Sequence, residues 1–321
     1  MPGYIDFSST SWPESIGLWF TLNSLLAAGA LLLDRLFGEF LNRWHPVVLI
    51  GAWINGFNRY FYADSIQRGG LLLLSTLAIT LLVSMVICTL LNFLPFWLSV
   101  PLAMIAASTL LAHRMLYDSV SAVLHSEHPA SAVAVLVSRD TEQLSDADAY
   151  KAAMESYAEN LSDGVVAPLL FLLLFGLPGI ALYKAINTLD SMVGYRTERF
   201  ENYGKISAKV DDIANWLPAR LSAILLMLVF KQWRFWAFYS YGRAHASPNA
   251  GHPIAAMALA CHCRLGGATR YFGRWQDKAY FGRAEETQHI QAHHLACSLS
   301  QRDLIDCLLI TGCVLPTLWL F

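Results

Sequence analysis

The chain has 321 residues, of which 55% are hydrophobic and 14% are charged, and its formal net charge is −2 at pH 7. Soluble globular proteins carry roughly 25% charged residues, so much of this surface is expected to face lipid rather than water. The near-neutral charge gives no basic field that would bind nucleic acid or attach the protein to a membrane by electrostatics alone.

Two uncharged runs in the first third of the chain predict membrane-spanning helices. The first covers residues 16–33. The second covers residues 71–112 and is about twice as long as the ~20 residues that cross a bilayer as a helix. Asn92 and Pro95 lie near its middle, so this run predicts a helical hairpin.

The basic residues predict an orientation. No Lys or Arg precedes Arg35, whereas residues 34–70 contain several arginines. Because basic residues concentrate in cytoplasmic loops, the N-terminus is expected outside and residues 34–70 inside. We therefore expect a protein of the cell (inner) membrane, with its active site on the cytoplasmic side.

A third uncharged run, residues 164–183, contains the breakers Gly176 and Pro178. A full crossing would move the basic stretch 184–216 outside, so a broken or re-entrant segment buried in protein is favoured. Shorter uncharged stretches follow, and no internal repeat is visible. The sequence therefore predicts an all-α, multi-pass helical integral membrane protein with cytoplasmic polar helical segments, forming a single domain over residues 1–321.

Acidic residues line up just before the third run. Glu155, Glu159 and Asp163 are spaced i, i+4 and i+8, which would stack them on one helical face. A solvated face is the alternative interpretation. Unpaired carboxylates beside an apolar segment are costly, so we favour a site that binds Mg²⁺ or an amine.

Upstream of these acids, Arg139 could bind a phosphate or carboxylate through two parallel hydrogen bonds. Its neighbours Asp140 and Thr141 could instead cap the next helix, and both roles are compatible.

A second polar group follows the third run. Lys184, Asn187 and Ser191 share one helical face, with Asp190 at its edge and Gly194 at the expected C-terminal cap. An ordinary polar face would show more Glu/Lys pairs, so a functional role is favoured.

A third group contains Asp211, Asp212, Asn215 and Arg220. Adjacent acids and an amide are oxygen ligands suited to a hard cation. Charges at a helix start near the membrane interface explain this pattern equally well.

Further along, Asn249 lies in a Pro-bracketed turn, and Arg264 precedes the pair Gly266-Gly267. Paired glycines allow the backbone to approach a ligand closely but are weak evidence alone. Cys261-His262-Cys263 could be part of a metal site, yet no second Cys/His pair supplies the missing ligands, so buried thiols are favoured.

Five ordered segments of the sequence resemble the CobD/CbiB family. They are ESYAENLSDGVVAP (155–168), YKAINTLDSMVGY (183–195), DDIANWLPARL (211–221), SPNAGHP (247–253) and RLGGATRYFG (264–273). The N-terminal Asp34…His45-Pro46-Val47 is similar to the family's opening motif. The resemblance runs from about residue 31 to 283.

The resemblance implies adenosylcobinamide-phosphate synthase, a membrane enzyme of late cobalamin biosynthesis. It would consume ATP, with Mg²⁺, and join aminopropanol or its phosphate to the propionate of adenosylcobyric acid. It implies as partners a corrinoid, the amino alcohol, the lipid bilayer and other late cobalamin-pathway enzymes. We assign as catalytic Glu155, Glu159, Lys184 and Asp190, as substrate-binding Arg139, Asn160, Asn187, Asn215, Arg220, Asn249 and Arg264, and as metal-binding Asp163, Asp211 and Asp212.

Two departures from the family pattern stand out. Glu39 occupies a position where the family usually has Asp, and Ile254 stands where it usually has Glu. Two alternatives follow: a degenerate family member that acts as a membrane sensor, or a membrane transporter, although transporters usually show repeated halves with matching broken helices.

Overall fold

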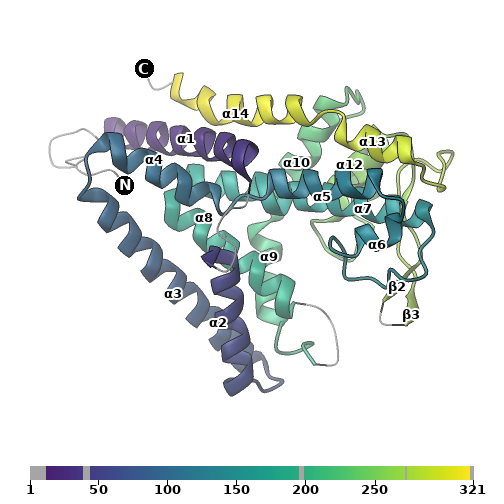
Figure 1. Cartoon of the computed structure of the whole chain (residues 1–321), viewed down its shortest axis with the longest axis horizontal. Coiled ribbons are helices and arrows are strands. Elements are labelled where there is room, and N and C mark those ends of the chain that lie inside the picture. The colour runs from purple at the N-terminus through teal and green to yellow at the C-terminus, as the bar shows by residue number, and fades with distance from the viewer. Residues whose placement is uncertain (1–11, 39–43, 195–198, 272, 319–321) are drawn as a thin grey trace. The chain divides into compact units, whose positions relative to one another are not determined.

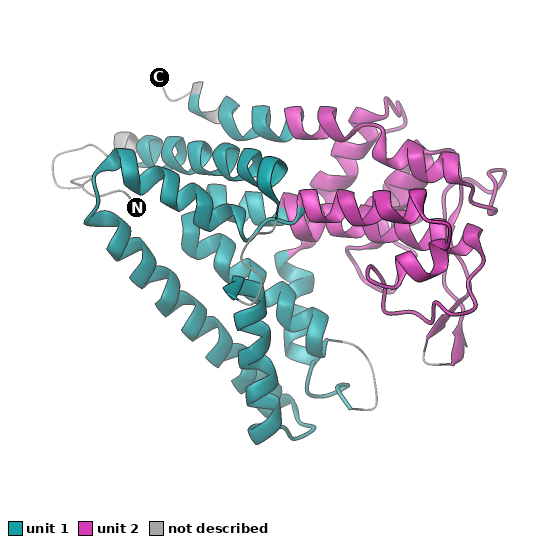
Figure 2. Ribbon diagram, viewed as in Figure 1, with its two compact units in different colours: residues 1–112, 167–214, 308–321 teal, residues 113–166, 215–307 magenta. Residues whose placement is uncertain are grey.

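The computed structural model describes residues 12–38, 44–194, 199–271 and 273–318 (Figure 1). The described residues are mostly helical, with four very short strands among them. The predicted helical fold class is confirmed. The chain forms two compact units, each built from separate stretches of sequence, so neither unit is contiguous (Figure 2).

The first unit contains residues 1–112, 167–214 and 308–321. Its helices are α1 (Trp12–Phe37), α2 (Pro46–Phe61), α3 (Ile66–Asn92), α4 (Phe96–Ser108), α8 (Ala167–Val193) and α9 (Lys205–Ala214). The helix α8 packs against α1, α2, α3 and α9. Side chains from α2, α3 and α8 form a buried cluster around Ile54, Leu72 and Leu189.

The second unit contains residues 113–166 and 215–307. Its elements are α5 (His113–His125), α6 (Pro129–Val133), α7 (Asp146–Leu161), the π-helical turn η2 (Ser162–Val166), α10 (Trp216–Val229), α11 (Ala237–Gly242), α12 (Gly251–Ala260) and α13 (Ala292–Leu299). The last helix, α14 (Arg302–Leu318), begins in this unit and ends in the first. The helix α7 contacts α5, α6, α12 and α13.

Two antiparallel ribbons in the second unit were not predicted. Strand β1 (Leu265–Gly266) pairs with β4 (Tyr280–Phe281), and β2 (Thr269–Tyr271) pairs with β3 (Arg274–Gln276). These strands are two or three residues long, too short to show an alternating apolar pattern in the sequence.

Four helical stretches among the described residues are long and apolar enough to cross a membrane: Ile16–Phe37, Ile66–Asn92, Phe96–His125 and Asp146–Val193. The bent pair Lys205–Ala214 and Trp216–Val229 would make a fifth if it forms one span. Only 22% of the apolar window of Ile66–Asn92 is buried. Large exposed side chains such as Leu74, Leu82 and Leu90 on α3 therefore suit contact with lipid.

The predicted break in the third apolar run lies at Gly176. Its backbone has φ 66° and ψ −159° inside α8, a conformation that is essentially restricted to glycine. The interruption is therefore confirmed, while re-entry of this segment from the same side stays a prediction.

Candidate active site

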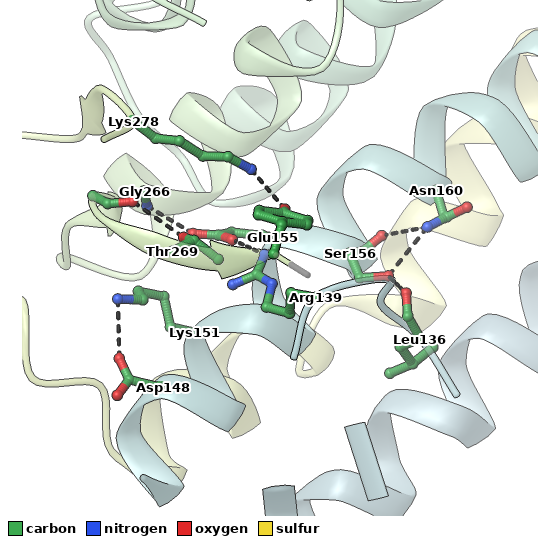
Figure 3. A network of polar contacts seen from close by, with 12 residues as sticks. Leu136, Arg139, Asp148, Lys151, Glu155, Ser156, Asn160, Gly266, Thr269 and Lys278 are labelled. Carbon is green, nitrogen blue, oxygen red and sulfur yellow. Dashed lines mark hydrogen bonds and ion pairs between the residues drawn. The ribbon is translucent and has the colours of Figure 1, made fainter. Parts of the chain in front are cut away.

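A buried ion pair joins a loop to the middle of α7. The guanidinium of Arg139 donates from Nη2 to Oε2 of Glu155 at 2.6 Å, and the two side chains are 8% and 11% exposed. The other carboxylate oxygen of Glu155 accepts the backbone N–H of Gly266 at 2.7 Å. We call this arrangement the Glu155 clasp; Figure 3 shows Glu155 between Arg139 and Gly266.

The clasp fixes the charge of its cation. Burial alone would lower the pKa of Arg139, but the adjacent Glu155 carboxylate outweighs burial and the net shift is upward. Both carboxylate oxygens of Glu155 are engaged in these contacts, and the catalytic role of Glu155 stays a prediction. Its contacts make it a residue that positions the loop and the ribbon.

The start of α7 corrects one expectation. The cap of this helix is Ser145, whose hydroxyl accepts the N–H of Asp148 at 3.2 Å, so neither Asp140 nor Thr141 caps it. Asp140 instead accepts the backbone N–H of Gly273 at 2.7 Å and ties the loop to the second ribbon. The cap prediction was wrong because Ser145, closer to the helix, satisfies the first turn.

Gly266 and Gly267 both have left-handed backbones, with φ of 81° and 83°. A Cβ on Gly266 would lie 2.1 Å from the carbonyl oxygen of Ala279, and one on Gly267 would lie 2.5 Å from the Tyr280 ring. The backbone at this pair therefore lies close against other protein atoms, and a close approach to a ligand stays a prediction. This close packing allows the Gly266 N–H to reach Glu155.

The predicted stack of three carboxylates is divided by a change of helix type. The helix α7 ends at Leu161, and Asp163 lies in the π-helical turn η2. Glu155 is buried whereas Glu159 is exposed, and the charged neighbours of Glu159 include Asp163 and Lys278. Single π-turns inside α-helices are frequent at functional sites.

Lys278 is a site residue that the sequence did not single out. Its Nζ donates to the Tyr271 hydroxyl at 2.7 Å and lies 4.4 Å from the centre of that ring. The nearby Thr269 hydroxyl donates to the Gly267 carbonyl (Figure 3). Lys278 follows the quoted motifs, and its proximity to Glu159 depends on pairing in the short ribbons.

Asn215 and Arg220 of the third sequence group contact η2 and the turn that contains Asn249. The amide of Asn215 donates to the Asp163 carboxylate and its oxygen accepts the Ser162 hydroxyl. One turn further on, Arg220 donates to the Asn249 side chain at 2.8 Å and to the Pro248 carbonyl at 3.0 Å. Segments that are far apart in sequence are therefore joined in one unit.

The predicted substrate-binding residues Asn160 and Arg264 also belong to the second unit. The Asn160 amide donates to the backbone and hydroxyl oxygens of Ser156. Arg264 stacks over the Tyr280 ring, 4.5 Å from its centre.

The remaining predicted residues lie in the first unit: Lys184, Asn187 and Asp190 on α8, and Asp211 and Asp212 on α9. Asp212 is a charged neighbour of Asp190, and the Gly194 N–H bonds to the Asp190 carbonyl at 2.7 Å where α8 ends. The helix therefore ends beside Gly194, as predicted, but the backbone of Gly194 does not take the left-handed conformation of a glycine cap. The joint action of these residues with those of the second unit stays a prediction.

A cavity of about 550 Å³ opens beside the clasp in the second unit. Its walls come from the loop at 139–144, the first turns of α7, β2 and Trp275. Of the predicted site residues only Arg139 lines it.

The metal prediction divides between the units, because Asp163 belongs to the second and Asp211 and Asp212 to the first. Within the described ranges, no group of three or more His, Cys, Asp or Glu side chains could hold a metal ion. Mg²⁺ usually keeps several waters and binds through one or two carboxylates and substrate phosphates. Binding of Mg²⁺ by Asp163, Asp211 and Asp212 stays a prediction.

Cys261 and Cys263 are both buried, as predicted.

Comparison with known proteins gives consistent matches over most of the chain. The family model described as CobD/Cbib protein matches residues 27–300. This chain is similar to the cobalamin biosynthesis protein CobD of Halalkalibacterium halodurans (36% identical over 270 residues, 79% of this chain and 84% of that protein). It also resembles the protein of the same name from Geobacter metallireducens (39% over 272 residues, 79% and 84%) and the probable cobalamin biosynthesis protein CobD of Pyrococcus abyssi (40% over 264 residues, 79% and 87%).

The chain belongs to the CobD/CbiB family. No solved structure matches it. The resemblance inferred from the ordered motifs is thus confirmed.

Of the two departures from the CobD/CbiB pattern, only Ile254 lies among the described residues. Ile254 lies in α12, where it is 4% exposed, so an apolar residue suits that position. Glu39 lies outside the described residues.

Proposed function

We propose that this protein is an ATP-dependent amide-forming ligase of cobalamin biosynthesis. It would join aminopropanol, or its phosphate, to the propionate of adenosylcobyric acid and give adenosylcobinamide or its phosphate. Membership of a family whose relatives are named cobalamin biosynthesis proteins supports this proposal.

The observation that carries the proposal is the assembly of motif residues around α7 in the second unit. Arg139, Glu155 and Gly266 form the clasp, and Asn215 and Arg220 join η2 and the Asn249 turn to α10. A structural membrane scaffold has no need for such a set of buried polar contacts, each of which must offset its desolvation.

Glu159 is the proposed acid–base residue of this site. It is exposed, unlike Glu155, and its neighbours include an acid, Asp163, and a cation, Lys278. A carboxylate in this position can hold the ammonium group of an amino alcohol and accept its proton as the amide forms. Arg220 and Lys184 are proposed to bind the propionate or phosphate groups, and the predicted asparagines to bind the corrin amides.

ATP would supply the activation that a carboxylate needs, since a carboxylate is a poor acyl donor. In the overall reaction a P–O bond of ATP breaks as a phosphoryl group moves to the carboxylate, the C–N bond forms as that carboxylate oxygen leaves with the phosphoryl group, and the ammonium group of the amino alcohol loses two protons. We propose that the chain's basic side chains neutralise the phosphates together with Mg²⁺.

Complementation tests the proposal directly. We expect the chain to restore growth on cobyric acid to a strain that lacks its own amide synthase, and to yield cobinamide that mass spectrometry detects. Membrane expression without rescue and without amide product would contradict the proposed function.

The same strain tests the residue assignment. Glu159→Gln removes the carboxylate and Lys184→Ala removes the cation, so both variants should lose rescue. Glu285→Gln is the matched control, because Glu285 is exposed in the second unit and has no proposed role. Normal growth from both site variants at wild-type expression would refute the assignment.

A further inference from the structure

The cavity beside the clasp has lining residues of unusual composition. Its basic members are Arg139, Lys151 and Arg270, its acidic members Asp140, Glu142 and Asp148, and its other members include Thr141, Gln143, Thr269 and Trp275. Its volume of about 550 Å³ falls in the range of small-molecule sites, roughly 300–1,000 Å³.

The cations of the cavity keep donor capacity after their contacts within the protein are counted. Arg139 is 92% buried, and its Nε makes no hydrogen bond within the described part of the chain. The Nε of Arg270 lies 3.6 Å from Asp140, too long for a hydrogen bond. Buried guanidinium N–H groups without an acceptor are costly.

Each cation is held in place by an acceptor. Lys151 lies 3.1 Å from Asp148 (Figure 3), Arg270 donates to Gln143 at 2.5 Å, and Arg139 is fixed by Glu155. The basic groups are therefore positioned before any ligand arrives, which reduces the entropy cost of binding.

The acidic members restrict the ligand class. The lining holds three basic and three acidic side chains, so a bare polyanion would meet as many negative as positive groups. A phosphate that carries Mg²⁺ can contact both the acidic and the basic side chains. The Mg²⁺ ion takes one or two carboxylates together with phosphate oxygens, and the basic side chains bind the remaining phosphate oxygens.

Trp275 adds an apolar surface to this polar cavity. It is 72% exposed although it is large and aromatic, and it lies on β3, paired with Arg270 on β2. An exposed indole beside a phosphate site suits stacking of a nucleobase.

We propose that this cavity binds the phosphate groups of a phosphate-bearing ligand as its magnesium complex, through Arg139, Lys151 and Arg270. The inference rests on the proposed function, in which the ligand is either the nucleoside triphosphate or the phosphorylated amino alcohol. Lys151 is eight residues before Glu159 on α7, about 12 Å along the helix axis. The cavity is therefore a neighbouring subsite of the same unit.

Calorimetric titration of the full chain in detergent tests the proposal without requiring turnover. The probes are ATP, aminopropanol phosphate and inorganic phosphate, each with Mg²⁺ and with a chelator. We expect ATP or aminopropanol phosphate to bind, with affinity at least tenfold weaker in chelator. Arg270→Gln and Lys151→Gln should each weaken binding about tenfold or more.

Further variants show which of the two ligands occupies the cavity and whether the effect is specific to its lining residues. Arg283→Gln is the control, because Arg283 is 33% exposed against 37% for Arg270 and does not line the cavity. Trp275→Ala should weaken ATP binding while leaving aminopropanol phosphate unchanged if the nucleotide occupies the cavity, and should change neither affinity if the amino alcohol phosphate does.

The cavity assignment is overturned if neither organic phosphate binds, or if Arg270→Gln and Lys151→Gln bind as the wild type does. Binding confined to inorganic phosphate at millimolar concentration also overturns it. Failure of the proposed function is a separate result, since that is loss of amide product by the wild-type chain.

Discussion

Glu155 has the chemistry of a catalytic residue, but it is held in a buried ion pair with Arg139. Removing one partner of a buried ion pair leaves an uncompensated charge, which typically costs 3–5 kcal/mol. We therefore expect Glu155→Leu to lower the thermal midpoint strongly, by an amount equivalent to about 3 kcal/mol, in unfolding of the detergent-solubilised protein.

Two comparisons make this prediction specific. The double variant Glu155→Leu with Arg139→Met should recover part of the loss, since neither charge remains buried alone. The exposed pair Arg114–Asp118, at 3.4 Å, is the control, and Asp118→Asn should change stability by less than ~1 kcal/mol. Equal effects at both pairs would contradict the buried-clasp interpretation.

Cys297 provides a pH-dependent prediction. A hydrogen bond from the Cys261 thiol lowers the pKa of Cys297 to about 7, against the opposing effect of burial. The reactive thiolate should therefore accumulate as pH rises through about 7 rather than near the ordinary value of about 8.5. Mass spectrometry of the Cys297 peptide after timed iodoacetamide treatment measures the rate.

The matched change is Cys261→Ala, which removes the donor and should move the inflection of the Cys297 rate upward. Cys263 serves as an internal reference, because burial raises its pKa to about 12, and it should stay unmodified. A wild-type inflection at or above 8.5 would count against the hydrogen bond.

At the level of elements, the ribbon β1–β4 positions the Gly266 N–H that donates to Glu155. Gly266→Ala places a methyl group 2.1 Å from the Ala279 oxygen, so the strands must separate and the clasp must loosen. We expect faster protease cleavage around residues 264–281 and loss of thermal stability.

Gly273→Ala separates steric conflict from backbone strain. Gly273 has φ of 76°, close to that of Gly266, but nothing lies within 4 Å of the Cβ position. Both variants carry the cost of a left-handed alanine, about 1 kcal/mol or somewhat more, and only Gly266→Ala carries the clash. If the two variants behave alike, packing at Gly266 is not what restricts it to glycine.

At the scale of the whole molecule, orientation in the membrane is the main open prediction. The arginines within residues 34–70 predict that this stretch is cytoplasmic. Reporter fusions after Asn58 and Glu127 should both be active with a cytoplasmic reporter and silent with a periplasmic one. Activity of the periplasmic reporter at either position would contradict the predicted orientation.

Which features of the fold could be predicted from the sequence depends on how many consecutive residues determine each feature. Composition and long uncharged runs predicted the membrane helices, because crossing a bilayer is a property of about 20 consecutive residues. Local rules also predicted the break at Gly176, whose backbone takes a conformation that favours glycine, and the end of α8 beside Gly194.

The site was predictable only in part. The motifs singled out Glu155 and Arg139, yet not that they bind each other. Lys278 and Trp275 were missed because each owes its place to the short ribbons. Lys151 lies on α7 and was missed because the loop and strand that complete its cavity come from other segments. The spacing of Asp163 and Glu159 predicted that they are neighbours, which they are, but not that the helix changes to the π-helical turn η2 at Asp163.

The amino-acid sequence by itself determined that this is a helical membrane protein, and its ordered motifs gave the family. Only the tertiary structure decided that Glu155 is buried in the Glu155 clasp while Glu159, one turn away, is exposed. The physical reason is that helical spacing fixes which side chains share a face, whereas burial and hydrogen-bond partners depend on what packs against that face from elsewhere in the chain.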